Sequence, residues 1–117
     1  MNTAAEKPTT LTLNSQFTRL YQNGDSCVRP SLVLYARKNG LDRNRLGITV
    51  SKKIGKAHLR NRAKRRLRAL FRDNIHSLKS GYDFVLVARS RTITENYPTL
   101  LKDFEIASKK VGVLQND

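Results

Sequence analysis

The sequence predicts an α+β fold, with helices packed on a small sheet in the order α-β-β-β-α-β-α. Segments with apolar residues at steps of three and four indicate amphipathic helices, and shorter alternating segments indicate strands. Glycine, proline and an Asn-Gly pair separate these segments. A chain of 117 residues suits one domain. We expect residues 1–12 to form a flexible tail and residues 13–117 to form a single domain.

The first expected element is a short helix. Asn14 fits the N-cap position, and Gly24 is a natural stop. Its apolar residues recur at i, i+3 and i+4 spacing: Phe17, Leu20 and Tyr21. A short strand is then expected near residues 26–29, ended by Pro30, because proline interrupts strand pairing. The element order given above depends on this strand.

Two longer strands are expected at residues 31–37 and 45–52, separated by a turn at Asn39-Gly40. In the first strand Leu32, Leu34 and Ala36 share one face, and Val33, Tyr35 and Arg37 share the other. In the second strand Leu46, Ile48 and Val50 share one face, and Gly47, Thr49 and Ser51 share the other. A face of such small and polar residues is expected to stay open.

The longest helical pattern covers residues 57–79 and ends before Gly81. Its apolar stripe consists of Leu59, Ala63, Leu67, Leu70, Phe71, Ile75 and Leu78. Residues 82–89 are apolar on both faces, which is typical of an interior strand. A polar loop is expected at residues 90–96, and Pro98 fits the start of a last helix. The apolar stripe of that helix consists of Leu100, Phe104, Ala107, Val111 and Leu114.

The charge balance indicates a polyanionic partner. The chain has 23 Lys and Arg against 9 Asp and Glu, a net charge of +14, which attracts nucleic acid or anionic membrane. No apolar run approaches the roughly 20 residues that span a bilayer. Residues 1–10 lack the apolar core of a signal peptide. Cys27 is the only cysteine, so no intrachain disulfide forms. We therefore expect a cytoplasmic protein that does not enter membranes.

The strongest positive charge lies on and before the long helix. The basic residues are Lys52, Lys53, Lys56, Arg60, Arg62, Lys64, Arg65, Arg66, Arg68 and Arg72. No Asp or Glu occurs between Arg43 and Arg72. A merely solvated helix face is the alternative, but such faces usually mix Glu with Lys, because like charges repel. Cations in the first turn also oppose the helix dipole. Bound phosphate groups would offset both of these energetic costs. We therefore interpret the helix as a phosphate-binding surface.

The segment SKKIGKAHLRNRAKRRLR, residues 51–68, resembles the bacterial ribonuclease P protein subunit. The family's RNR core matches Arg60, Asn61, Arg62, Lys64 and Arg65. Chain length, charge and element order agree from Asn14 to Leu114. The resemblance implies a fold like domain 2 of ribosomal protein S5, with a left-handed βαβ crossover around the basic helix.

The resemblance also implies a function and two binding surfaces. The protein would be a subunit of the endoribonuclease that removes the 5′ leader from precursor tRNA. It would be monomeric by itself, and one copy would bind each catalytic RNA. The implied contacts to the catalytic RNA are Lys52, Lys53, Lys56, Arg60, Asn61, Arg62, Lys64, Arg65, Arg66 and Arg68. The implied leader-binding cleft, between the first helix and the open sheet face, consists of Phe17, Tyr21, Val33, Tyr35 and Arg37. The RNA and its Mg²⁺ would carry the chemistry.

The residues themselves leave alternatives open. Aromatic residues on a basic background suit stacking of unpaired bases, yet Phe17 and Tyr21 also fit a helix-core pair. A ribosomal protein, an RNA chaperone, a major-groove DNA-binding helix and a membrane-surface helix are further candidates. No catalytic side chain and no metal site are predicted. His58 and His76 have no carboxylate at triad or metal spacing, and Cys27 has no companion ligand.

Overall fold

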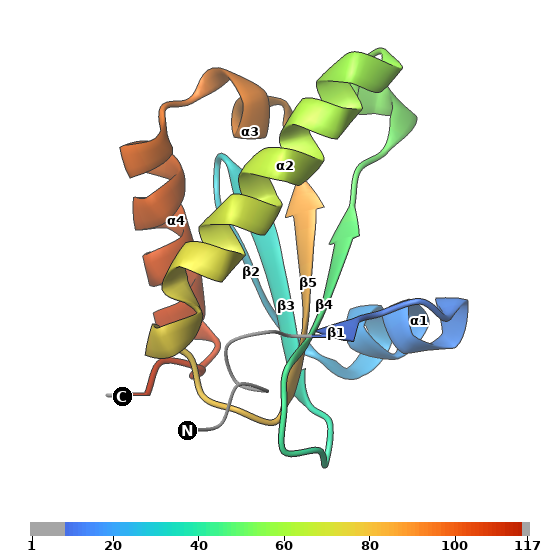
Figure 1. Ribbon diagram of the computed structural model, residues 1–117, viewed down its shortest axis with the longest axis vertical. Helices are drawn as coiled ribbons and strands as arrows, with labels where there is room; N and C mark the ends of the chain where they lie inside the picture. Colours follow the sequence, from blue (N-terminus) through green and yellow to red (C-terminus); the bar gives the residue numbers. More distant parts are fainter. Residues whose placement is uncertain (1–8, 116–117) are drawn as a thin grey trace.

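The computed structural model describes residues 9–115. Its strands are β1 Thr9–Thr10, β2 Asp25–Val28, β3 Leu32–Lys38, β4 Arg45–Thr49 and β5 Tyr82–Ala88. Its helices are α1 Asn14–Asn23, α2 Ala57–Asn74, α3 Ser90–Thr94 and α4 Tyr97–Lys110, with single 3-10 turns at Lys52–Ile54 and Ile75–Ser77 (Figure 1). The predicted α-β-β-β-α-β-α order is therefore confirmed, with two additions: β1 and α3.

The strands form one sheet in the order β1-β4-β5-β3-β2. β3 runs antiparallel to both β2 and β5, whereas β4 runs parallel to β5. A parallel pair requires a crossover connection, and α2 provides it. In Figure 1 the chain rises through β4, descends through α2 in front of the sheet and rises again through β5, to the left of β4. This crossover is left-handed, whereas about 98% of such connections are right-handed.

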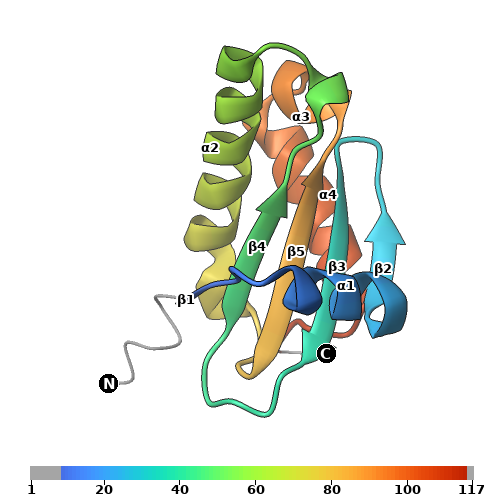
Figure 2. The same cartoon turned by 90° about the vertical axis from the view of Figure 1, so that its right-hand side faces the viewer.

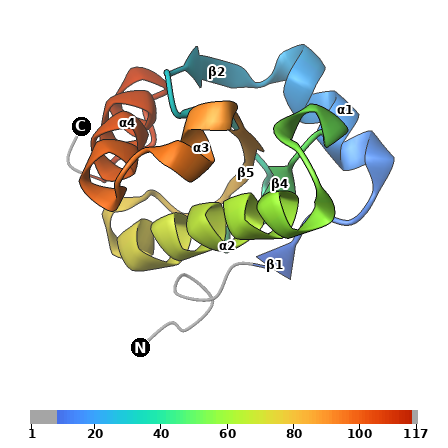
Figure 3. The ribbon, with the colours of Figure 1, turned by 90° about the horizontal axis from the view of Figure 1, so that it is seen from above.

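The helices divide between the two faces of the sheet. α1 crosses one face (Figure 2), and α2 lies on the other side of β4 (Figure 3). The main core fills the space under α2 and α4, where Phe71, Phe84 and Phe104 pack edge to face. A smaller cluster of Leu11, Leu20 and Val85 lies under α1. The apolar character of β5 on both faces follows from this position, since it lies between β3 and β4 with helices above and below.

The predicted strand faces are confirmed, with one correction. Leu32, Leu34 and Ala36 are buried in the main core, and Leu46 and Ile48 pack against it. The opposite face of β4 was expected to stay open, but Gly47 is buried. The ring of Phe17 from α1 covers it, because the absence of a side chain on glycine leaves room for an aromatic ring on the backbone.

Several element boundaries differ from the prediction at the amino-terminal end. Thr9 and Thr10 pair with Arg45 and Leu46 of β4, and Leu11 is 3% exposed. Ordered structure therefore begins earlier than the predicted tail boundary at residue 12, while residues 1–8 lie outside the described residues. Asn14 is the first helical residue and Leu13 the N-cap. The Gln16 side chain accepts hydrogen bonds from the backbone N–H groups of Thr12 and Leu13, 3.0 Å each.

The segment at residues 90–96 was expected to be a polar loop, which is wrong. It contains α3, because Thr92 is fully buried and its hydroxyl donates to the Ser31 carbonyl at 2.5 Å. Ser31 lies in the loop between β2 and β3. Asp103 of α4, which is 5% exposed, also holds this loop. The Asp103 carboxylate accepts hydrogen bonds from the Ser31 backbone N–H (3.0 Å), the Ser31 hydroxyl (2.6 Å) and Arg29 Nε (3.0 Å).

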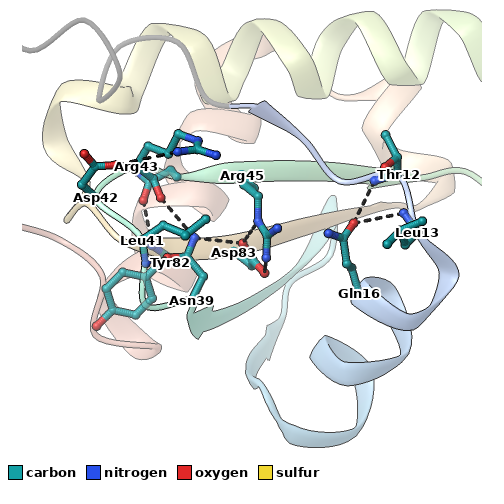
Figure 4. A network of polar contacts seen from close by, with 11 residues as sticks. Thr12, Leu13, Gln16, Asn39, Leu41, Asp42, Arg43, Arg45, Tyr82 and Asp83 are labelled. Atoms are coloured by element: carbon teal, nitrogen blue, oxygen red, sulfur yellow. Dashed lines mark hydrogen bonds and ion pairs between the residues drawn. The ribbon is translucent and has the colours of Figure 1, made fainter.

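A second polar network closes the other end of the sheet (Figure 4). Arg45 on β4 donates two hydrogen bonds of 2.7 Å to Asp83 on the neighbouring β5. Asn39 donates to the same carboxylate at 3.0 Å. The hydrogen bonds to Asp83 raise the pKa of Arg45, although partial burial of the guanidinium acts in the opposite direction. The network fixes β4 against β5.

Candidate nucleic-acid interface

The basic helix presents most of its predicted cations to solvent. Gly55, at a φ of +139°, turns the chain from the 3-10 turn Lys52–Ile54 into α2, a backbone conformation that favours glycine. The exposed members of the predicted set are Lys52, Lys53, Lys56, Asn61, Arg62, Lys64, Arg65 and Arg68. Arg60 and Arg66 are half-buried. The buried stripe of α2 consists of Ala63, Leu67, Leu70 and Phe71.

These cations have few partners inside the protein. Among the described residues, the only ion pair of α2 with a carboxylate joins Arg72 to its neighbour Asp73 at 3.6 Å. Arg66 donates from Nη1 to the Ile93 carbonyl of α3 at 2.7 Å. The Nε atom of Arg60 is buried without a hydrogen-bond partner in the described part of the chain. The positive charge of α2 is therefore largely uncompensated, as the sequence predicts for a phosphate-binding surface.

The predicted aromatic residues gather where α1 crosses the sheet. The rings of Tyr21 and Tyr35 meet edge to face, with centroids 5.0 Å apart, and those of Phe17 and Tyr21 lie 6.5 Å apart. The Tyr21 hydroxyl is 2.6 Å from the Thr49 hydroxyl on β4. Tyr21 is 41% exposed, whereas Phe17 and Tyr35 are half-buried. Phe17 thus belongs partly to the small core, and Tyr21 offers a ring to solvent.

Two adjoining hollows, of about 340 and 180 Å³, lie between α1, β4 and α2. Phe17, Ile48 and Lys64 line both. Tyr21 and Thr49 line the larger hollow, and Arg68 lines the smaller. We call this continuous depression the β4 groove, defined by Phe17, Tyr21, Ile48, Thr49, Lys64 and Arg68.

The β4 groove unites residues that the sequence analysis assigns to separate surfaces. Phe17 and Tyr21 come from the predicted leader cleft, and Lys64 and Arg68 from the predicted set for the catalytic RNA. Val33, Tyr35 and Arg37 line neither hollow: Val33 and Tyr35 are half-buried on the sheet face under α1, and Arg37 is exposed near the end of β3. Ile48 and Thr49 were missed as site residues, because strand periodicity alone does not reveal which edge of a sheet is open.

The β4 groove brings together two kinds of side chain, aromatic rings and cations. Exposed aromatic rings stack on unpaired bases, and adjacent cations bind the phosphates that link those bases.

The carboxylate arrangement differs from that of a metal centre: the described residues contain no group of three or more His, Cys, Asp or Glu side chains close enough to hold a metal ion. Within residues 9–115, no helix is both long and apolar enough to cross a membrane. The fold and these surfaces define a small, basic α+β protein suited to bind a polyanion.

Comparison with known proteins gives the family. The ribonuclease P family model matches residues 5–112. A ribonuclease P protein component from Caldanaerobacter subterraneus subsp. tengcongensis is 43% identical over 94% of this chain and 95% of its own length. The structure of the Staphylococcus aureus RNase P protein superposes with a TM-score of 0.80 at 31% identity, covering 93% of this chain and 100% of that one. The Thermotoga maritima RNase P protein superposes with a TM-score of 0.74 at 33% identity, covering 83% of this chain and 92% of that one. The chain belongs to the ribonuclease P protein family.

Proposed function

We propose that this chain is the protein subunit of a ribonucleoprotein that removes the 5′ leader from precursor tRNA, with the catalytic RNA supplying the chemistry. Family membership supports the subunit role. The RNA contacts in this proposal rest on one observation: the uncompensated basic helix and the aromatic residues of α1 meet in one groove along β4. The catalytic RNA would bind α2 and the 3-10 turn before it, and the unpaired leader would enter between α1 and the sheet.

The protein contributes binding and electrostatics in this proposal. Arginine presents a planar set of donors that matches phosphate oxygens, and Arg dominates the exposed arc of α2. Neutralising phosphates on both RNAs reduces their mutual repulsion and thereby lowers the concentration of Mg²⁺ that the catalytic RNA requires. In this proposal Mg²⁺ binds the RNA, as the family resemblance implies. One protein per catalytic RNA, acting in the cytoplasm, completes the proposal.

The test is cleavage of precursor tRNA by a bacterial ribonuclease P RNA at low Mg²⁺, with and without this protein. We expect little cleavage by the RNA alone and restored cleavage at the mature 5′ end when the protein is added. Catalytic-RNA binding without restored cleavage would contradict the proposal and would favour a ribosomal or RNA-chaperone role. A Lys109→Gln variant, changed at an exposed position near the end of α4, serves as the charge control and should restore cleavage normally.

A further inference from the structure

The cations of α2 lie next to different parts of the protein. Lys64 and Arg68 are one helical turn apart and line the β4 groove. Arg66 points to the other flank, where it donates to the Ile93 carbonyl of α3. At about 100° per residue, Lys64 and Arg66 diverge by about 160° around the helix axis. Arg62 and Arg65 are exposed and line neither hollow. The helix therefore presents separate positive surfaces rather than a single one.

The β4 groove follows an open sheet edge. β1 pairs only with Arg45 and Leu46, so the rest of β4 has no strand neighbour on that side among the described residues. The Leu46 carbonyl accepts a hydrogen bond from the Leu11 N–H at 3.0 Å, which shows that the backbone groups of Leu46 face this edge. Backbone groups alternate in direction along a strand, so those of Ile48 face the same side. The groove floor thus carries backbone polar groups of β4.

The side walls of the β4 groove have complementary chemistry. Phe17 and Tyr21 stand on α1, and Lys64 and Arg68 stand opposite them on α2. No carboxylate lines either hollow, and neither cation forms an ion pair within residues 9–115. An unpaired nucleotide chain has the matching pattern, with bases for the rings and a phosphate at every step for the cations. Duplex RNA does not match, since its bases are stacked in its interior.

We propose that Lys64 and Arg68 bind phosphates of the single-stranded leader in the β4 groove, while Arg62 and Arg65 bind the catalytic RNA. This inference rests on the proposed function and divides the set of cations that the family resemblance assigns to the catalytic RNA alone. The basic helix then contacts both RNAs at once, one on each side. Because the groove joins α1 to α2, the bound leader lies between its aromatic contacts and the helix that contacts the catalytic RNA.

The experiment compares two variants with the same loss of charge, Lys64→Gln/Arg68→Gln and Arg62→Gln/Arg65→Gln. Each is assembled with ribonuclease P RNA at saturating protein, and binding of precursor tRNA with a one-nucleotide or an eight-nucleotide leader is measured across a salt series. Each phosphate contact on a single strand contributes about 0.7 to the slope of log K against log salt. For the long leader, Lys64→Gln/Arg68→Gln should therefore reduce that slope by about 1.4.

The same variant should leave the slope for the one-nucleotide leader unchanged and should bind the catalytic RNA within about threefold of the wild type, a change of less than 1 kcal/mol. Arg62→Gln/Arg65→Gln should weaken catalytic-RNA binding instead, with the preference for a long leader retained after saturation. Equal effects of the two variants on both RNAs would overturn the inference.

A third variant, Tyr21→Ala, separates this inference from the proposed function. If Tyr21→Ala abolishes the preference for a long leader and Lys64→Gln/Arg68→Gln does not, the leader uses the aromatic wall alone and the assignment of the two cations is wrong. If no groove variant changes the preference while the holoenzyme cleaves precursor tRNA, the leader does not enter the groove, which overturns the inference but leaves the subunit role intact.

Discussion

The ring of Phe17 rests directly on the backbone of Gly47. A Cβ atom placed on Gly47 would stand 2.6 Å from both Cε1 and Cζ of Phe17 and 3.3 Å from the Leu11 Cβ. Real side chains do not approach so closely, so glycine at this position determines how near α1 lies to β4. The depth of the β4 groove and the position of its aromatic wall both depend on this contact.

Gly47→Ala should therefore displace Phe17 and destabilise the protein by about 1–3 kcal/mol, the usual cost of overpacking a filled site. Urea unfolding measures the loss, and binding of leader-bearing tRNA should weaken in parallel. Phe17→Leu in the Gly47→Ala background should recover part of the stability, because the smaller side chain leaves room for the methyl group. Unchanged stability and binding in Gly47→Ala would show that α1 does not depend on this contact.

Tyr35 should act on the leader through Tyr21, whose ring it supports edge to face at 5.0 Å. Tyr35→Ala should weaken binding of precursor tRNA by about 1–3 kcal/mol, the value of one base–aromatic stack, and leave mature tRNA binding nearly unchanged. Adding Tyr21→Ala to Tyr35→Ala should weaken precursor-tRNA binding only a little further, since the two residues share one interaction. Tyr97→Ala on α4 is the aromatic control. Equal losses for precursor and mature tRNA would rule out a leader-specific role.

Binding of the catalytic RNA should depend steeply on salt. Six to ten phosphate contacts correspond to a loss of about 10³–10⁵ in affinity between 50 and 200 mM salt. Arg62→Gln should reduce the slope of log K against log salt by about 1, whereas Lys109→Gln should leave it unchanged. Filter binding or fluorescence titration across a salt series measures this slope, and a flat dependence for the wild type would exclude phosphate contact as the main source of affinity.

Stability should fall in acid because of Asp103. Burial alone would raise the pKa of Asp103, but hydrogen bonds from Ser31 and Arg29 outweigh it and lower the pKa below its ordinary value. The group therefore stabilises the fold above the unfolded-state pKa of about 3.9, and this contribution is lost as pH falls through the lower folded-state pKa. Asp103→Asn should remove that part of the pH dependence. Urea unfolding from pH 6 to pH 2 is the measurement, and parallel curves for the two proteins would contradict the assignment.

Anions should stabilise the free protein. The net charge of +14 repels itself in the compact state, and a ligand that binds only the folded state raises its stability by mass action. Sulfate at millimolar concentration should raise Tm more than sodium chloride of matched ionic strength. The increment should shrink in Arg62→Gln/Arg65→Gln. Identical melting in both salts would argue against an anion site that exists before RNA binds.

Local patterns in the sequence were sufficient for most of the fold. The heptad-like stripe around Leu67 and Phe71 identified α2, and the two-sided apolar run at residues 82–88 identified β5 as an interior strand. The errors occurred where a distant contact decides a local structure. α3 forms because Thr92 is buried against Ser31, and β1 forms because Thr9 and Thr10 pair with β4. Neither partner is close in sequence, so no local periodicity predicts the element.

The sequence by itself determined the character of this protein: a basic α+β domain whose Arg-rich helix has an apolar side and a charged side, since helical periodicity and charge are local properties. Only the tertiary structure decided which cations line the β4 groove and which lie outside it. The left-handed crossover places α2 beside the open edge of β4, and the packing of Phe17 on Gly47 brings α1 to the opposite wall. Lys64 therefore joins Tyr21 in one groove, although 43 positions separate them in the chain, because the path of the backbone sets distances that no spacing in the sequence encodes.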